Sequence, residues 1–271
     1  MLRRALSLCS GLLGRRPAAG DGFRDELAFW DRQLSGLGAY AEDVRRRSTP
    51  SLMPLVYPHY LEPLLEEVRA RTGAPPRVLD AGSGPLSMWA DGAEHQRIAL
   101  TCSDALADAY RGLLARHGLR PRYPLVQCAG EALSARFGEA AFDVAWMHNA
   151  LDHTQDPGAV VRELVRVLAP GGYLVVQGWC REGTAERFIG LHRHDLWVEP
   201  PGRLMLRTLS DDGRRLSGPV APCDGLGLEL LEASAPSRTP RTWMKLVWRK
   251  PAAGYASTAT RGASAQSPSR S

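Results

Sequence analysis

Two acidic residues and two glycines, set around two short apolar runs, could do chemistry together. Asp80 ends the run VLD, Gly82 and Gly84 stand two and four residues after it, and Asp104 ends the next run, IALTCSD. A glycine-rich turn after a strand lets a ligand approach the backbone, and an acid at the end of the next strand can accept hydrogen bonds from ribose hydroxyls. The spacing therefore predicts a site for an adenosine-containing cofactor.

Three residues around this turn distinguish the two common cofactors of this kind. An NAD site needs a third glycine where this chain has Ser87, and Pro85 lacks an N–H that a phosphate would use. Asp80 would repel a pyrophosphate, whereas a carboxylate suits the cationic amino group of S-adenosylmethionine (SAM), which carries no phosphate. We therefore expect SAM as the cofactor and disfavour a nicotinamide oxidoreductase.

Two histidines are the candidate catalytic residues. SAM donates a methyl group from a sulfonium centre, so an enzyme that uses it mainly aligns donor and acceptor. A hydroxyl acceptor also gains about 10²–10⁴-fold from a general base. His153, in LDHTQDP, and His148, near the end of FDVAWMHN, could serve as that base. The alternative for His153 is a structural role, packing against the following helix or capping it.

The segment LHRHDLW holds His192, His194 and Asp195 close together. Two histidines and an acid on an extended segment could ligate a metal, but such residues are more often hydrogen-bonded surface groups. We therefore predict no metal site, and we expect His192 and His194 to contact the acceptor.

Alternating strand and helix patterns must position these residues. We expect strands at 77–82, 97–104, 124–129, 142–149 and 172–178, and helices at 86–91, 105–117, 131–137, 157–168 and 184–192. A β-hairpin at 195–216, with the turn SDDG, and closing strands at 227–235 and 242–250 follow. Nearly continuous apolar strands joined by helices indicate a parallel sheet covered on both faces. The predicted fold class is α/β: a Rossmann-like seven-stranded, mostly parallel sheet with helices on both faces, an N-terminal helical extension and an inserted β-hairpin near the C-terminus.

The distribution of charge argues against nucleic acid as a partner. Arginines in residues 1–20 and in the tail after Pro251 contribute six positive charges with no acid, so removing them from the net charge of +5 leaves −1 for the body. The five cysteines are scattered and form no Cys-x-x-Cys pair, which fits a reducing compartment. No apolar run reaches the roughly 20 residues of a membrane span. We expect a soluble cytoplasmic protein that acts on a small-molecule acceptor; the oligomeric state is left open.

Several motifs together resemble the class I SAM-dependent methyltransferases, in particular the ubiquinone/menaquinone-methyltransferase-like (type 11) group. They are VLDAGSGP, the acid at Asp104, CAGEAL, FDVAWMHNALDHTQDP and VVRELVRVLAPGGYLVVQG. The resemblance covers about 77–178 and implies a SAM-dependent methyltransferase domain at 73–251. Composition and helical periodicity predict a basic extension (1–20), a helical cap (21–72) and a disordered, low-complexity tail (252–271) around it.

The resemblance also assigns roles to individual positions. Asp80, Gly82 and Gly84 match the loop that holds the methionine moiety, and Asp104 matches the acid that binds the ribose. The remaining matches are Ala105 at the adenine face, Gly130 and Glu131 at the adenine edge, and His148 and Asn149 near the methyl-donor centre. There we expect His148 to contact the cofactor and Asn149 to contact the acceptor. One departure is Ala129, because the family often has an acid there.

The function expected from these residues is methyl transfer from SAM to an oxygen or nitrogen of a small molecule. The alternative is a catalytically silent partner or regulatory protein with the same fold. Ala129 is the one motif position that favours the alternative.

Overall fold

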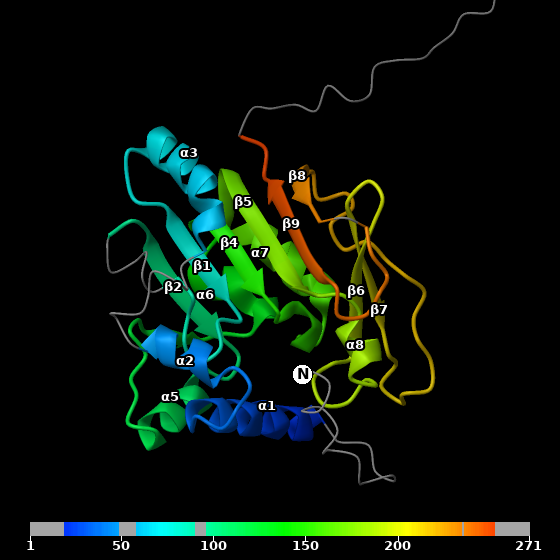
Figure 1. Ribbon diagram of the computed structural model, residues 1–271. Helices are drawn as coiled ribbons and strands as arrows, with labels where there is room; N and C mark the ends of the chain where they lie inside the picture. The colour runs from blue at the N-terminus through cyan, green and yellow to red at the C-terminus, as the bar shows by residue number, and fades with distance from the viewer. Residues whose placement is uncertain (1–18, 49–57, 90–95, 235, 253–271) are drawn as a thin grey trace, which may run out of the picture.

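The structure, a computed structural model, describes residues 19–48, 58–89, 96–234 and 236–252 (Figure 1). Its centre is a seven-stranded sheet in the order β3-β2-β1-β4-β5-β9-β8. The strands are β1 (Arg77–Ala81), β2 (Ala99–Asp104), β3 (Leu125–Gln127), β4 (Phe142–His148), β5 (Leu168–Trp179), β8 (Glu229–Ala233) and β9 (Trp243–Arg249). The first five pair in parallel, and β9 and β8 close the sheet antiparallel. The predicted fold class is confirmed.

Apolar residues fill both faces of the sheet, which explains the nearly continuous apolar runs. On β1, Val78 packs with Leu65 and Val68 of α3 (Glu62–Thr72), which follows the short helix η2 (His59–Leu61). The next residue, Leu79, faces the opposite side and joins the cluster around α7 (Pro157–Val167), beside α6 (Leu133–Phe137) and η3 (Gly130–Ala132). Because side chains alternate along a strand, Asp80 points to the face of Val78.

Two helices from the start of the described chain lie across the carboxyl ends of the central strands (Figure 1). They are α1 (Ala19–Leu34) and α2 (Ala41–Ser48). Leu27, Trp30 and Leu34, spaced three and four residues apart, pack against α5 (Ala107–Arg116). Phe23 of α1 and Leu37 after it are 37% and 75% exposed. Leu37 lies beyond the end of the helix, which explains its exposure.

The inserted hairpin is present, but its turn differs from the prediction. Strands β6 (His194–Glu199) and β7 (Arg203–Thr208) pair antiparallel, and their turn falls at residues 200–202. Gly202 there has a φ of 127°, which favours glycine. The motif SDDG makes a second turn instead, and Leu209 before it and Leu216 after it form an isolated bridge. Apolar residues of the hairpin join the cluster around α7, so the hairpin shares the main core.

Two predicted helices are wrong or shortened. Residues 86–89 form turns rather than the start of a helix at 86–91, because the Ser87 side chain bonds locally to Asp80 and to the Trp89 N–H; residues 90–91 lie outside the described residues. In place of a helix at 184–192, α8 (Glu182–Ala185) is one short turn. Arg187 and Phe188 then adopt positive φ values of 57° and 55°, which a right-handed helix excludes.

The predicted basic extension (1–20) and disordered tail (252–271) lie outside the described residues, apart from residues 19, 20 and 252. Within the described ranges, no helix is long and apolar enough to cross a membrane.

Candidate active site

The glycine turn is fixed to the neighbouring strand by its own backbone. The N–H groups of Gly82 and Ser83 both donate to the carbonyl oxygen of Ser103, at 2.8 and 3.1 Å. Gly82 and Gly84 have φ values of 68° and 62°. A Cβ on Gly82 would lie 2.6 Å from the Cβ of Ala150, so only glycine fits this close approach.

Asp104 joins the same turn to the end of β2. Its carboxylate accepts hydrogen bonds from the N–H groups of Gly84 and Leu106, at 3.0 and 2.8 Å. Burial raises the pKa of this carboxyl to about 6, and His153 lies near enough to oppose the rise. A carboxylate offers about four acceptor positions. Two of them are used here, so Asp104 can also accept from the hydroxyls of a ribose.

Asp80 is a buried acid with one unpaired oxygen. Its side chain accepts a 2.6 Å hydrogen bond from the Ser87 hydroxyl at Oδ2, and Oδ1 has no partner among the described residues. Burial raises the pKa of Asp80 to about 7. A buried carboxylate oxygen without a partner is costly, and a cationic ligand group would relieve that cost. Asp80, the glycine turn and Asp104 therefore suit the amino group and the ribose of SAM.

The residues expected at the adenine have different surroundings. Ala105 is exposed beside Asp104. Glu131 accepts hydrogen bonds from the N–H groups of Gln155 and Asp156, so its carboxylate fixes the start of α7. Gly130 lies against Val160, where a Cβ would come within 3.0 Å of the valine methyl groups. No acidic side chain stands at Ala129.

His148 is the middle of an aromatic and hydrogen-bonded group at the end of β4. Its Nδ1 contacts the Gln177 amide at 2.5 Å, and the Tyr60 hydroxyl donates to the other end of that amide. The rings of Trp146 and Trp243 lie 5.0 and 5.2 Å from its ring. Burial, and then the charge of Arg47, lower the pKa of His148 to about 3. With a pKa this low the ring is neutral at pH 7 but only a weak proton acceptor, which disfavours His148 as a general base. Gln177 was not predicted, because only the folded chain brings it to His148.

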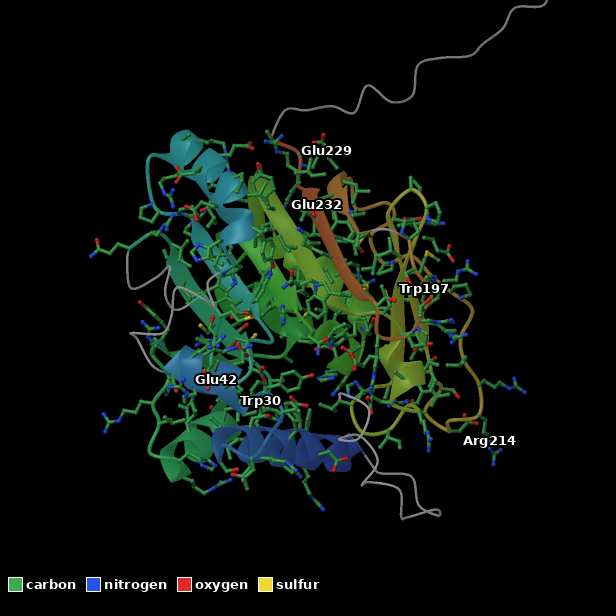
Figure 2. The ribbon with its side chains drawn as sticks, viewed as in Figure 1. Trp30, Glu42, Trp197, Arg214, Glu229 and Glu232 are labelled. Carbon is green, nitrogen blue, oxygen red and sulfur yellow. The ribbon has the colours of Figure 1, made fainter. Side chains whose placement is uncertain are left out.

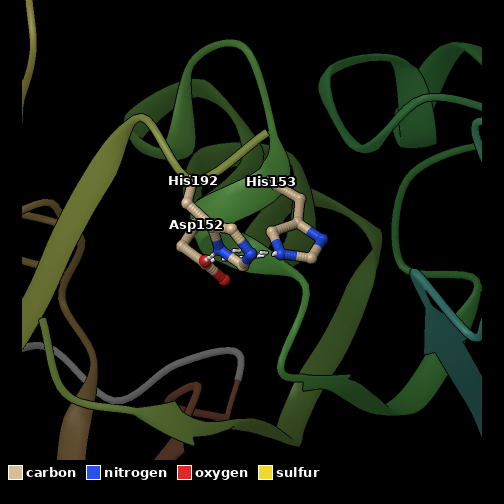
Figure 3. A group of neighbouring side chains, drawn as sticks. All are labelled: Asp152, His153 and His192. Carbon is tan, nitrogen blue, oxygen red and sulfur yellow. Dashed lines mark hydrogen bonds and ion pairs between the residues drawn. The ribbon is translucent and has the colours of Figure 1, made fainter. Parts of the chain in front are cut away.

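Asp152, His153 and His192 meet just beyond β4 (Figure 3). His192 Nδ1 lies 2.9 Å from Asp152 Oδ2 and 3.2 Å from His153 Nε2. Burial alone would lower the pKa of His192, but the bond and the charge of Asp152 raise it. His153 Nδ1 faces Glu26 of α1, at 3.8 Å from Oε2. The structure thus brings together two of the predicted residues, with an aspartate that strengthens the proton affinity of His192.

His194 and Asn149 are engaged within the protein. The two ring nitrogens of His194 lie 2.9 Å from the Thr208 hydroxyl and 2.9 Å from the Thr154 carbonyl oxygen, and the residue is 2% exposed. Asn149 has a φ of 50° and its side chain accepts from the Trp179 N–H. An acceptor contact on the LHRHDLW segment therefore rests on His192.

The cap helix α1 covers the glycine turn. The Trp30 ring, labelled in Figure 2, lies 3.0 Å from where a Cβ on Gly84 would stand. The Trp30 indole N–H donates to Glu26 at 2.8 Å. One helix thus carries both a cover for the turn and a carboxylate that faces His153.

Comparison with known proteins places the domain. Residues 79–176 match the family model described as a methyltransferase domain. The chain therefore contains a methyltransferase domain over this segment. The predicted resemblance to class I SAM-dependent methyltransferases is confirmed there, and with it SAM as the cofactor of the domain.

Individual relatives are distant. An uncharacterized methyltransferase of Schizosaccharomyces pombe is 29% identical over 153 residues, which are 52% of this chain and 54% of that protein. The chloroplastic tocopherol O-methyltransferase of Arabidopsis thaliana is 36% identical over 55 residues, 20% of this chain and 16% of that protein. The chain thus spans about half, or less, of the curated relatives it matches.

Among solved structures, the 1,6-didemethyltoxoflavin-N1-methyltransferase of Burkholderia thailandensis is similar. It was solved with 1,6-didemethyltoxoflavin and S-adenosylhomocysteine bound. The TM-score is 0.45 at 19% identity, over 89% of this chain and 93% of that chain.

Proposed function

We propose that this chain transfers the methyl group of SAM to an oxygen or nitrogen of a small-molecule acceptor. The supporting observation is the placement of the His153–His192–Asp152 group beside the turn that Asp104 binds. His153 Nδ1 lies 3.8 Å from Glu26 of α1, and Trp30 of the same helix lies over Gly84, whose N–H donates to Asp104. A cofactor acid and a proton-accepting pair thus share one edge of the sheet, as methyl transfer to a protonated acceptor requires.

Each residue has a defined part in this proposal. SAM, when bound, supplies a methyl group on a sulfonium that is already activated for displacement. Asp80 would hold the cationic amino group, and Asp104 would hold the ribose. Trp30 would exclude water from the turn. His153 and His192 would receive the acceptor atom and its proton, with Asp152 stabilising the charge on His192.

The proposed function also assigns a part to each segment of the chain. We propose residues 73–251 as the catalytic domain and 21–72 as its cap, with a cytoplasmic location. A small-molecule acceptor, rather than nucleic acid, is supported by the net charge of −1 that remains when the six terminal arginines are subtracted from +5. The tocopherol O-methyltransferase among the relatives supports an acceptor with an aromatic hydroxyl.

The experiment is transfer of a labelled methyl group from SAM to a panel of catechols, hydroquinones, hydroxyketones and aromatic amines. Formation of S-adenosylhomocysteine and a labelled product is the expected result. His153→Ala should lower the rate about 10²–10⁴-fold while SAM still binds. His117→Ala is the matched control, because His117 pairs with Asp31 at 2.7 Å away from the site. Equal rates in both variants would remove His153 from the catalytic step.

A catalytically silent SAM-binding partner is the second candidate, favoured by the absence of an acid at Ala129. SAM binding without transfer to any acceptor in the panel would support it over the proposed activity.

A further inference from the structure

Three potential metal ligands converge beyond β4 (Figure 3). The atoms are Asp152 Oδ2, His153 Nε2 and His192 Nδ1, and they form a triangle. Its sides are 2.9 Å from aspartate to His192, 3.2 Å between the histidines and 3.5 Å from His153 to the aspartate. Ligands about 2.1 Å from a metal ion stand about 3.0 Å apart at right angles and about 3.4 Å apart in a tetrahedron. The triangle therefore has the dimensions of one face of a coordination shell.

Hydrogen bonds alone cannot satisfy all three of these atoms at the same time. The Nδ1 atom of His192 has a single in-plane position for a proton or a lone pair. It nevertheless faces both Asp152 Oδ2 and His153 Nε2 within 3.2 Å. One proton can only be shared between the two partners, whereas one cation inside the triangle would bind all three atoms at full strength.

A second observation comes from Glu182. This residue is 9% exposed, and its Oε2 has no hydrogen-bond partner among the described residues. Asp152 and His192 are among the charged groups that act on it. A buried carboxylate oxygen without a partner, in the field of two imidazoles and another carboxylate, is the kind of group that a bound cation neutralises.

The surroundings also resemble those of metal-bound histidines. Such histidines usually face a carboxylate with their other ring nitrogen, which fixes the orientation of the ring. His153 Nδ1 lies 3.8 Å from Glu26 Oε2. The side chains of His153 and His192 are 19% and 27% exposed, so one side of the triangle is open.

We propose that Asp152, His153 and His192 bind a divalent transition-metal ion whose remaining coordination positions receive the acceptor. Imidazole ligands favour transition metals over Mg²⁺ and Ca²⁺. Resting on the proposed methyl transfer, this site implies an acceptor with two adjacent oxygens, such as a catechol or a hydroxyketone. With the ion bound, His153 and His192 would act as ligands in place of the base: the ion would lower the pKa of the bound hydroxyl, and its proton would pass to solvent water.

This site was not predicted from the sequence. The sequence pattern drew attention to His192, His194 and Asp195, which are neighbours in the chain. In the folded protein Asp195 instead accepts from Thr184 and Arg207. The other two ligands, Asp152 and His153, come from a segment some forty residues before His192.

The test is titration of the full chain, produced without a histidine tag and freed of metal by a chelator, with Co²⁺. About one equivalent of Co²⁺ should bind and give visible absorption, which should disappear when Zn²⁺ displaces the Co²⁺. His153→Ala and His192→Ala should each weaken Co²⁺ binding more than a hundredfold, and Glu182→Gln about tenfold. His117→Ala should bind Co²⁺ like the unaltered chain. Melting curves of each variant establish that it is folded.

Absence of Co²⁺ binding would overturn the metal site. So would folded His153→Ala and His192→Ala variants that bind Co²⁺ as tightly as the unaltered chain. A separate SAM titration on the same samples distinguishes this failure from failure of the proposed function. SAM binding and methyl transfer in metal-free protein would leave the methyltransferase proposal standing and refute the metal.

Discussion

At the scale of single residues, the site keeps two carboxyl groups in surroundings that disfavour their charge. Burial raises the pKa of Asp80 to about 7 and that of Asp104 to about 6. Asp104 recovers part of this cost through two backbone N–H donors, whereas Asp80 has one hydroxyl donor and one unpaired oxygen. Of the two acids, Asp80 therefore costs the free protein more stability.

Replacing Asp80 with asparagine should reveal this cost through its dependence on pH. Between pH of about 4 and about 7 the unfolded chain has released the Asp80 proton while the folded chain retains it. Stability therefore falls as the pH rises through this window. Relative to the unaltered chain, Asp80→Asn should gain up to about 4 kcal/mol in the free energy of unfolding between pH 4 and pH 8. Urea denaturation without SAM, at both pH values, measures the difference.

The exposed Asp108→Asn variant is the control and should show no such gain. A constant difference between Asp80→Asn and the unaltered chain across these pH values would mean that Asp80 is not strained in the fold. The same substitution should weaken SAM binding, because an amide carries no charge to meet the amino group.

At the scale of elements, the sheet was predictable and several connections were not. The five parallel strands are apolar along their length because both faces are covered, so they stand out in the sequence. The helix expected after the glycine turn is absent at residues 86–89, because the Ser87 side chain competes for backbone groups. The hairpin turn at 200–202 was missed because SDDG is the stronger turn signal. Local bonds and competing turns decide such boundaries, and composition shows neither.

Gly82→Ala should lower the free energy of unfolding by more than the backbone strain at its positive φ alone would cause. Gly82 and Gly73 both have a φ of 68°, but a Cβ on Gly73 meets nothing within 4 Å whereas one on Gly82 lies 2.6 Å from Ala150. Gly73→Ala should therefore cost about 1–2 kcal/mol of backbone strain. Gly82→Ala should cost about 1–3 kcal/mol more from overpacking, and should weaken SAM binding. Equal losses in urea denaturation, with unchanged SAM affinity, would contradict the close packing of the turn.

At the scale of the whole molecule, the site combines segments that are distant in the chain. Asp80 and Asp104 were predictable because each ends a strand of one motif. The meeting of His153, His192 and Glu26 was not, since it depends on how α1, the loop after β4 and the segment before β6 pack together. The cap helix α1 is the element that connects these two parts, through Trp30 at the turn and Glu26 at His153.

Trp30→Ala should therefore loosen the cofactor site. Removing a half-buried indole from the turn should lower the free energy of unfolding by about 2 kcal/mol and raise the SAM dissociation rate. Phe29→Ala is the matched control, because Phe29 is 40% exposed on the same helix beside Trp30. Stopped-flow displacement of SAM measures both rates, and similar rates in the two variants would show that α1 does not cover the cofactor.

The most direct test of the account is calorimetric titration of the full chain with SAM and, separately, with NADH, alongside Asp104→Asn. We predict micromolar SAM binding, no NADH binding, and a loss of SAM affinity of about 10- to 100-fold in the variant, because hydrogen bonds to a charged group are lost. Asp108→Asn should bind SAM like the unaltered chain. Failure of the folded chain to bind SAM, or full affinity in Asp104→Asn, would contradict the account.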